Sequence, residues 1–307
     1  MVKRALVTGG AGFIGSHLVH RLVQECYEVV VLDDLSLGRR ENVPPEAHLV
    51  VGSVTDPLVT LGSLFDRGHF DVVFHLAALP RVQYPIDHPE ETHAVNAIGT
   101  LHMLEYCRSQ NVPRFVFSSS SSVYGNQERL PLVESMPLSP MSPYAAQKEE
   151  GEALCSAWNA SYGLETISLR YFNVFGPRQS ADGGYACLIP KVTRACLSGR
   201  PPELWGDGSH TRDFTYVDDV VEANLAAARV TRSDAFGRAY NIGAGKGYSV
   251  LQVMNTIQEL LGTSFEPLRK PEAIEPAHTQ ADIGLARTVL GWVPRVSFEE
   301  GLSRTVE

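Results

Sequence analysis

The stretch Ala5-Leu6-Val7-Thr8-Gly9-Gly10-Ala11-Gly12-Phe13-Ile14-Gly15 decides the fold of this chain. A short apolar run leads directly into spaced glycines, and a helical pattern then extends to Glu25. Glycines between a strand and a helix permit a tight turn and let a pyrophosphate approach the backbone at the helix N-terminus. A turn that merely packs the helix against the strand is the alternative. The strand–turn–helix setting favours a dinucleotide-binding site.

Two acidic residues follow the second apolar run, Val29–Leu32. Asp33 and Asp34 lie about 20 residues beyond the last glycine, where a carboxylate can accept hydrogen bonds from both hydroxyls of an adenine ribose. A 2′-phosphate would meet like charge at Asp33, so the sequence favours NAD over NADP. Arg39 and Arg40 follow and could offset that charge, although solvation of the surface is the other role open to them.

The first half of the chain alternates apolar runs with helical patterns, which predicts an α/β fold with a doubly wound parallel sheet. Strands are expected at Ala5–Thr8, Val29–Leu32, His48–Val51, Val72–His75, Phe115–Ser118 and Glu165–Leu169, and helices at Phe13–Glu25, Thr60–Asp66, Glu91–Gln110 and Tyr144–Tyr162.

The local amino-acid composition changes after about Tyr171. Glycine, proline and turn residues become denser, with helical patterns near Val217–Ala228 and Val250–Leu261. We therefore expect an NAD-binding domain over residues 1–170 that carries the catalytic residues. A smaller α/β lobe over residues 171–307 is expected to bind the substrate and to be interleaved with the first domain.

Composition argues against several classes of protein. A formal net charge of −9 leaves no basic footprint for nucleic acid, so an anionic substrate needs individually placed arginines. The five cysteines are widely spaced without a Cys-x-x-Cys pair, which argues against a disulfide framework or a zinc cluster and predicts buried thiols. No apolar run reaches membrane-spanning length, and the few residues before the glycines lead us to expect no signal peptide. We expect a cytoplasmic protein with no metal, membrane or nucleic-acid partner.

Tyr144 and Lys148 share one face of a predicted helix, one turn apart. Removing a proton from a secondary alcohol needs a base, and a free tyrosine titrates too high to serve near neutral pH. A lysine ammonium one turn away stabilises the phenolate and lowers the tyrosine pKa. Ser120, in the run Ser118–Ser122, would orient the same hydroxyl. A helix start with an exposed lysine, and a polar linker after a strand, are the alternatives. Together with the glycine-rich turn, the three residues predict a hydride-transfer site.

These motifs resemble those of the extended short-chain dehydrogenases/reductases, and most closely the NAD-dependent nucleotide-sugar epimerase/dehydratase group that includes UDP-glucose 4-epimerase. The resemblance covers essentially the whole chain and implies a Rossmann-type sheet with a smaller substrate-binding lobe. The matching motifs are Thr8–His17, His75–Ala78, Asn96, Ser118–Gly125, Tyr144 with Lys148, Arg170–Asn173, Arg212–Asp219 and Asn241–Gly243.

The resemblance implies Ser120, Tyr144 and Lys148 as the catalytic set. It also implies that Asn173 and Arg212 hold the diphosphate of a UDP-sugar. A guanidinium suits that role, and a structural ion pair of Arg212 with Asp213 or Asp207 is the alternative. The expected cofactor-binding residues are Gly9, Gly12, Phe13, Ile14, Gly15, Asp33, Asp34, Ser53, Val54, Leu76, Ala77, Ala78, Asn96, Ser118, Tyr144, Lys148 and Tyr171. The expected substrate-binding residues are Arg81, Ser120, Ser121, Asn173, Cys187, Leu188, Arg212 and Thr279.

Ser121 and Ser122 favour a 4-epimerase within this family. Dehydratases carry Asp-Glu directly before Val-Tyr-Gly and decarboxylating relatives carry Glu, whereas serines stand there in this chain. Without an acid, elimination lacks its proton donor, while 4-epimerisation needs only a base and reversible hydride transfer. We therefore expect 4-epimerisation of UDP-glucose/UDP-galactose or an N-acetyl or uronate analogue, through a transient 4-keto sugar with NAD tightly retained. A 4,6-dehydratase or decarboxylase, and a catalytically silent NAD-binding regulatory protein, are the alternatives.

Four departures from the family pattern concern ligand contacts. Ser53 follows Gly52 where many relatives have Asp, which removes a possible adenine contact. Cys187 takes a position that is often Asn. Pro271–Glu275 replaces a frequent Arg-Pro-Gly-Asp, so a second phosphate-pairing arginine is missing unless Arg269 substitutes. Thr279 falls where a large aromatic narrows the sugar pocket in some relatives, so the site is expected to admit an N-acetyl group or a C6 carboxylate.

Two predicted helices carry apolar residues that suggest association. Relatives pair such helices into a dimeric four-helix bundle, so the resemblance implies a homodimer, and packing of the same residues against the sheet is the alternative. The residues concerned are Leu101, Leu104, Leu154 and Trp158.

Overall fold

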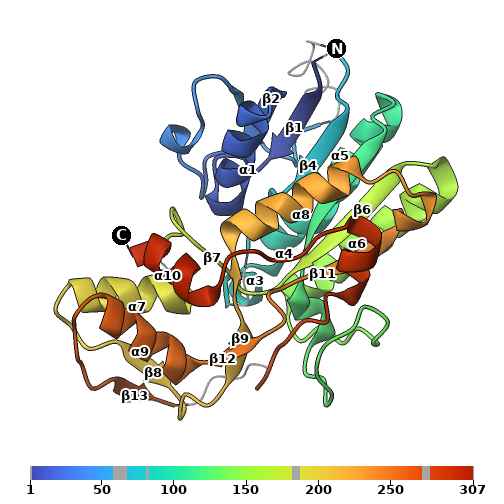
Figure 1. The fold of residues 1–307 in the computed structure, drawn as a ribbon. Coiled ribbons are helices and arrows are strands. Elements are labelled where there is room, and N and C mark those ends of the chain that lie inside the picture. The colour runs from blue at the N-terminus through green and yellow to red at the C-terminus, as the bar shows by residue number, and fades with distance from the viewer. Residues whose placement is uncertain (1, 58–67, 81–82, 182–186, 272–276, 307) are drawn as a thin grey trace.

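The computed structural model describes residues 2–57, 68–80, 83–181, 187–271 and 277–306, and its centre is a parallel sheet (Figure 1). The sheet has seven strands in the order β11-β6-β5-β4-β1-β2-β3, and every pairing within it is parallel. The strands are β1 (Arg4–Thr8), β2 (Glu28–Asp33), β3 (His48–Val51), β4 (Val72–His75), β5 (Arg114–Ser120), β6 (Glu165–Tyr171) and β11 (Arg238–Ile242).

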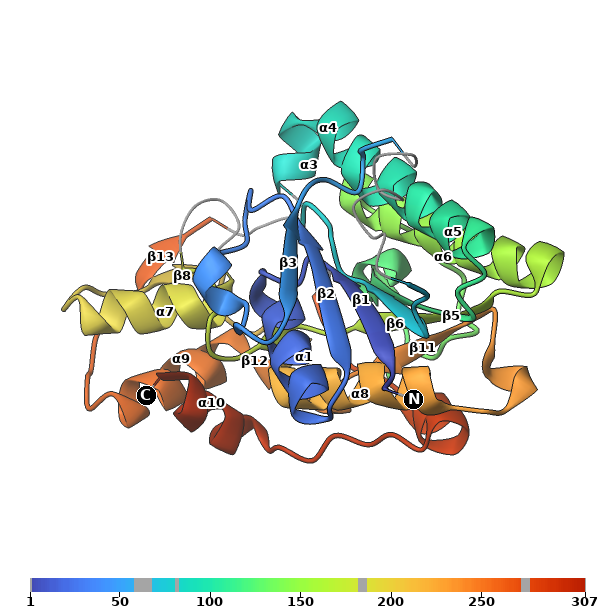
Figure 2. The ribbon, with the colours of Figure 1, turned by 90° about the horizontal axis from the view of Figure 1, so that it is seen from above.

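Helices cover both faces of this sheet, as the view from above shows (Figure 2). Helices α1 (Phe13–Gln24) and α8 (Val217–Arg229) lie on one face, and α5 (Gly99–Ser109) and α6 (Pro143–Tyr162) lie on the other. The apolar strands are buried on both sides, which explains why their sequences are nearly continuous in valine, leucine and phenylalanine. The doubly wound sheet predicted from the sequence is confirmed.

Strand β11 was not among the expected strands. It pairs with β6 through the register Arg238↔Ile167 to Ile242↔Tyr171 and forms one edge of the sheet. Its sequence, Arg-Ala-Tyr-Asn-Ile, is too short and too polar to announce a buried strand. Together with α8, it brings a segment beyond residue 171 into the layers of the central sheet, while the division at residue 170 stays a prediction.

The helix expected at Glu91–Gln110 is confirmed, and a π-helical turn lies within it. The segment contains α4 (Pro89–His93), a π-helical turn at Ala94–Ile98 and then α5, with the short α3 (Gln83–Asp87) preceding them. The Asn96 side chain accepts from Leu79 N at 2.8 Å and donates to Leu79 O at 3.0 Å. The widened turn holds Asn96 against that loop, as π turns commonly do at functional sites. The helix expected at Thr60–Asp66 lies outside the described residues.

The remaining elements form a lobe at one end of the sheet (Figure 1). The helices predicted near Val217–Ala228 and Val250–Leu261 are confirmed as α8 and α9. An aromatic cluster of Phe175, Phe214 and Phe298 fills the core of the lobe. The strand pairs are β7 (Val174–Phe175) with β10 (Thr215–Tyr216), β9 (Thr211–Asp213) with β12 (Gly247–Ser249), and β8 (Glu203–Trp205) with β13 (Leu268–Lys270), and the helices are α7 (Leu188–Leu197), α9 (Val250–Leu260) and α10 (Phe298–Val306).

The cysteines are less uniformly buried than expected. Cys107, Cys155 and Cys196 are buried, but Cys187 is partly exposed and Cys26 is exposed just after α1. Cys26 has a φ of +61° in the turn that leads to β2, which places it at the surface. Among the described helices, none combines the length and the apolar character needed to cross a membrane.

Candidate active site

Most of the candidate residues lie along one edge of the central sheet. Because the strands are parallel, their carboxyl ends meet at that edge, where α/β folds bind their ligands. The glycine-rich turn follows β1, Asp33 ends β2 and Leu76–Ala78 follows β4. Ser118–Ser120 ends β5 and Tyr171 ends β6. Residues spread over much of the sequence therefore face a common region.

The glycine-rich turn is shaped by contacts that exclude larger side chains. Gly9 has a φ of +71°, and a Cβ there would lie 2.7 Å from Ala77 N. A Cβ on Gly15 would lie 2.1 Å from the carbonyl oxygen of Gly9. Gly12 caps α1 and has no side chain with which to bond the amides of the first turn, which need other partners. This cradle fits a dinucleotide pyrophosphate.

Asp33 links the end of β2 to the same turn. Its carboxylate is buried and accepts hydrogen bonds from Ala11 N and Leu35 N, each at 2.9 Å. Burial raises the pKa of Asp33, and these two hydrogen bonds act against that rise. The remaining lone pairs of both oxygens suit ribose hydroxyls. Asp34 is exposed and bonds to Ser36 N and Oγ, so the geometry favours Asp33 as the ribose ligand.

We predict that Asp33→Asn weakens NAD binding roughly 10- to 100-fold, since hydrogen bonds to a charged group contribute about 1.5–3 kcal/mol. The amide removes the charge and sets an N–H against the N–H of Ala11 or Leu35. Discrimination against NADP should weaken too. Titration calorimetry with NAD and NADP measures both changes. Asp34→Asn is the control, and an equal loss of affinity in that variant would contradict the assignment.

A set of buried polar residues joins these loops, and it includes His75 and Gln147, to which sequence reasoning assigned no role. The His75 ring lies between Thr8 Oγ1 at 2.7 Å and Thr100 Oγ1 at 3.0 Å. Burial lowers the pKa of His75 to about 3, so the ring is neutral. Asn96 Nδ2 donates to Gln147 Oε1 at 2.7 Å, which ties the loop after β4 to α6. Two signals in the sequence could have drawn attention to these residues: His75 begins the motif His75–Ala78, and Gln147 directly precedes Lys148.

Tyr144 and Lys148 lie on consecutive turns at the start of α6. Ser142 caps this helix by accepting from Ala145 N at 3.2 Å, so the helix-start interpretation and the site interpretation hold together. The Lys148 side chain is buried, and its Nζ donates to Ser118 O at 2.8 Å. Nζ lies 5.8 Å from the Tyr144 ring centroid. Burial lowers the pKa of Lys148 to about 8, which contradicts the alternative of an exposed surface lysine.

Ser120 and Tyr171 complete the arrangement at the ends of β5 and β6. Ser120 Oγ accepts from Ser122 N at 3.2 Å and caps the short helical turn Ser121–Tyr124. Tyr171 OH bonds to Ser118 Oγ at 3.0 Å and accepts from Asn224 Nδ2 at 2.8 Å. Burial raises the pKa of Tyr171 to about 12, so this phenol is neutral and held in place.

Arg212 lies on β9 in the smaller lobe. Its Nη1 donates to the carbonyl oxygens of Thr211 at 3.0 Å and Ala277 at 3.2 Å. The buried Asp213 carboxylate accepts from three backbone amides, and burial raises its pKa to about 6. Asp207 accepts from Ser209 N and Oγ. The acids proposed as alternative partners of Arg212 are thus bound to other groups.

The other substrate candidates are spread around the entrance to this lobe. Asn173 is exposed two residues after the end of β6, while Cys187 caps α7 and Leu188 packs on the core of the lobe. Thr279 is buried beside Thr211, and its Oγ1 has no hydrogen-bond partner among the described residues. Ser121 is partly exposed. Arg81 and residues 272–276 lie outside the described residues.

Ser53 and Val54 differ in what they can offer a cofactor. Ser53 Oγ bonds to Thr55 Oγ1 at 2.8 Å, and Ser53 N donates to Asp56. The Val54 side chain is buried in the core against Gly99, where an added Cβ would lie 2.5 Å from Val54 Cγ2. The structure therefore places the Val54 side chain in the hydrophobic core rather than on the ligand face.

Comparison with known proteins places this arrangement in a family. Residues 5–243 match the NAD dependent epimerase/dehydratase family. The chain belongs to this family. Its cofactor is NAD, in agreement with the cradle of the glycine-rich turn and with Asp33.

Three relatives of this epimerase/dehydratase are similar over their full lengths. The UDP-glucose 4-epimerase of Mycolicibacterium smegmatis is 38% identical over 311 residues, which covers 99% of this chain and 97% of the relative. The UDP-glucose 4-epimerase of Thermotoga maritima, solved with UDP-glucose, has a TM-score of 0.94 at 38% identity and covers 99% of this chain and 97% of its own. The UDP-N-acetylglucosamine 4-epimerase of Methanobrevibacter ruminantium has a TM-score of 0.92 at 35% identity with the same coverages.

Proposed function

We propose that this protein catalyses the NAD-dependent 4-epimerisation of a UDP-hexose. The observation that carries the proposal is the buried Lys148 ammonium, held on the Ser118 carbonyl one helical turn from Tyr144. This arrangement supplies a tyrosine base on the helix that Lys148 ties to β5, the strand that ends at Ser120. Similarity to UDP-sugar 4-epimerases supports the substrate class.

The residues of the site divide the reaction between them. Tyr144, as the phenolate stabilised by the Lys148 ammonium, takes the proton from O4 of the sugar. The Ser120 hydroxyl orients the same oxygen. When bound, NAD held by the glycine-rich turn and Asp33 would supply a reversible acceptor for the C4 hydride, which allows the sugar to pass through a transient 4-keto form. Tyr144 then gives its proton back, so the net reaction leaves both protein and cofactor unchanged.

The dehydratase and decarboxylase alternatives have less support from this site. Ser121 and Ser122 stand at the positions where those relatives carry acids, and neither hydroxyl can protonate a departing C6 oxygen as a carboxylic acid does. Asn173 and Arg212 are proposed to hold the diphosphate of the substrate. Thr279, whose hydroxyl is buried and has no hydrogen-bond partner among the described residues, is smaller than the aromatic residue of some relatives, and we propose that the sugar pocket admits an N-acetyl group or a C6 carboxylate.

The test is incubation of the purified protein with UDP-glucose, UDP-N-acetylglucosamine, UDP-glucuronate and their galacto partners, with chromatographic separation of products and no added reductant. Interconversion of one gluco/galacto pair supports the proposal and identifies the sugar. A stable 4-keto product would favour the dehydratase alternative. The absence of any conversion would favour the NAD-binding regulatory alternative. Turnover of UDP-glucose alone would contradict the proposal that the sugar pocket admits an N-acetyl group or a C6 carboxylate.

We predict that epimerase activity falls as the pH rises above about 8. The pKa of Lys148 is lowered to about 8 by burial, so the ammonium that stabilises the Tyr144 phenolate is lost as the pH passes that value. Below it the lysine is charged, and activity declines only where the tyrosine gains a proton. A profile of kcat against pH checks this. Activity that still increases with pH beyond 10 would contradict the requirement for a charged Lys148.

We further propose a homodimer formed through α5 and α6. Leu101, Leu154 and Trp158 are only partly buried in the single chain, which supports an apolar surface on these helices, whereas Leu104 packs fully against the sheet. Light scattering after gel filtration measures the oligomeric state. A cytoplasmic location stays a prediction from the sequence.

A further inference from the structure

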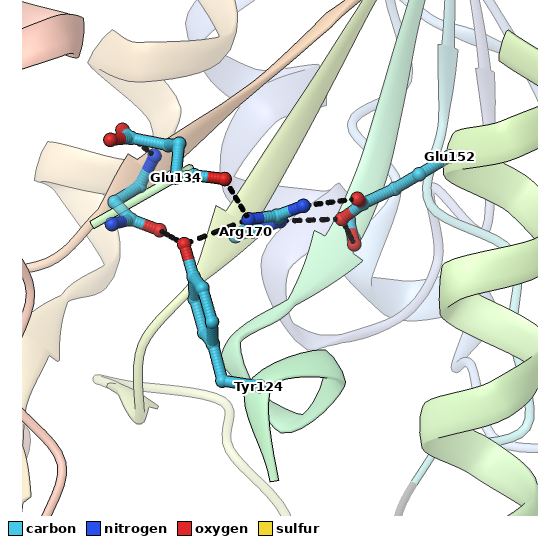
Figure 3. A network of polar contacts seen from close by, with 6 residues as sticks. Tyr124, Glu134, Glu152 and Arg170 are labelled. Carbon is cyan, nitrogen blue, oxygen red and sulfur yellow. Dashed lines mark hydrogen bonds and ion pairs between the residues drawn. The ribbon is translucent and has the colours of Figure 1, made fainter. Parts of the chain in front are cut away.

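A buried ion pair lies beneath the helix that carries the catalytic residues. Arg170 on β6 donates to both carboxylate oxygens of Glu152 on α6, through Nε at 2.9 Å and Nη2 at 2.7 Å. Both side chains are less than one-tenth exposed. Figure 3 shows the guanidinium and the carboxylate aligned edge to edge. Bidentate pairs of this kind have a defined geometry and are strongly held.

Glu152 occupies the turn of α6 that follows Lys148. Tyr144, Lys148 and Glu152 therefore lie on one face of the helix in consecutive turns. Both charged residues contact β5 at adjacent positions, since Lys148 Nζ donates to Ser118 O and the Ser119 hydroxyl donates to Glu152. Glu152 and Lys148 are thus both buried where α6 packs against the sheet.

Arg170 is itself held by groups from elsewhere in the chain (Figure 3). Its Nη1 donates to Tyr124 OH at 2.8 Å and to Glu134 O at 3.3 Å. Tyr124 OH donates to Asn241 Oδ1 at 2.7 Å, and Asn241 N donates to the Glu134 carboxylate at 2.8 Å. These contacts fix the guanidinium, which in turn fixes the position of Glu152.

The charge of Glu152 reaches Lys148 because the other groups around this lysine are neutral. His75, on β4, is neutral because burial lowers its pKa to about 3. Cys155, further along α6, is a neutral thiol because burial raises its pKa well above the usual range. Strand β5 presents a carbonyl and the Phe117 ring, and Glu152 is paired with the Arg170 guanidinium on β6. Cys155 and Glu152 are the two groups that favour the ammonium form, and because the Cys155 thiol is neutral, the Glu152 carboxylate is the one that carries a charge.

We propose that Glu152 is a positioning residue for the reaction: held by Arg170, its carboxylate keeps the Lys148 ammonium charged and aligned for Tyr144. This inference rests on the proposed function in so far as Tyr144 is the base. Burial of a lysine favours its neutral form, and an uncharged Lys148 would leave the phenolate without its stabilising field. The Glu152 carboxylate offsets the unfavourable burial of the charged lysine. Because Arg170 neutralises Glu152, the pair adds no net charge to the interior.

The test is Glu152→Gln, with Glu150→Gln on the exposed side of the same helix as the matched control. Loss of the carboxylate leaves the Arg170 cation uncompensated, so the alkaline limb of the kcat profile should move to lower pH by roughly one to two units, while the control keeps the wild-type profile. An unchanged alkaline limb in Glu152→Gln, with a uniform loss of rate, would assign Glu152 a merely structural role and overturn the proposal.

A second measurement needs no turnover and so separates this inference from the proposed function. The phenolate absorbance of Tyr144 is obtained as the difference between a protein and its Tyr144→Phe counterpart, with NAD bound and at a fixed pH near 8. We expect a smaller phenolate signal with Glu152→Gln than with wild type, and equal signals would overturn the inference. A wild type that converts no UDP-hexose yet shows this difference would refute the proposed function alone.

If Glu152→Gln alone does not fold, the double variant Glu152→Gln with Arg170→Met takes its place in these measurements. The double variant leaves no uncompensated buried charge, which is the main cost of breaking a buried ion pair, so this protein should fold. Its phenolate signal should lie between those of wild type and Glu152→Gln, because no unpaired cation remains. A double variant with the wild-type signal and the wild-type alkaline limb would show that Lys148 does not depend on Glu152.

Discussion

Tyr144→Phe is expected to lower kcat roughly 10³-fold while leaving NAD bound, because general acid–base catalysis contributes about 10²–10⁴-fold and phenylalanine keeps the ring. The lost hydroxyl is the group that takes the O4 proton in the proposed reaction. The first turn of α6 is capped by Ser142 and contains Pro143, and neither feature involves the phenolic oxygen. We therefore expect Tyr144→Phe to impair catalysis without disturbing the start of α6. Steady-state rates with the UDP-hexose identified in the panel, together with the NAD content of the purified variant, measure it.

Tyr162→Phe is the matched control, since Tyr162 ends the same helix and is exposed. Tyr162→Phe also removes one phenolic oxygen, and this substitution should leave kcat unchanged. A Tyr144→Phe enzyme with the wild-type rate would show that the base lies elsewhere in the site. A regulatory protein that only binds NAD would be indifferent to both substitutions.

Gly15→Ala is expected to weaken NAD binding by roughly 5- to 150-fold, because overpacking of a filled site typically costs about 1–3 kcal/mol. The added Cβ would lie 2.1 Å from the Gly9 carbonyl oxygen and 2.8 Å from Gly10 Cα. Both are backbone atoms, so no side-chain rotation can relieve the contact and the turn itself must move. The pyrophosphate cradle is displaced with it. Calorimetric titration of NAD into cofactor-free protein measures the loss.

Gly199→Ala separates this effect from a general cost of replacing glycine. Gly199 follows α7 with a φ of +66°, and nothing lies within 4 Å of an added Cβ. That substitution should cost about 1–2 kcal/mol of stability through the left-handed backbone alone, with NAD affinity unchanged. If Gly15→Ala binds NAD as tightly as Gly199→Ala, the cradle does not depend on the close approach of the two glycines.

Prediction from the sequence succeeded where the signal is local. The valine-rich run before Asp33 and the glycines after Thr8 each occupy a few consecutive residues, and strand β2, the turn and α1 lie where they were expected. The spacing of Tyr144 and Lys148 is likewise a property of a single helix. No local pattern announced the π turn at Ala94–Ile98, in which the Asn96 side chain accepts a hydrogen bond from Leu79 N in another loop.

The sequence by itself determined the parallel α/β sheet, the dinucleotide turn and the residue types of the catalytic set, because strand, turn and helix signals are carried by neighbouring residues. Only the tertiary structure decided that β11 completes the sheet beside β6, and that Arg170 meets Glu152 beneath Lys148. The charge state of Lys148 belongs to this second group. It depends on burial and on groups brought together from distant segments, and no local pattern encodes either.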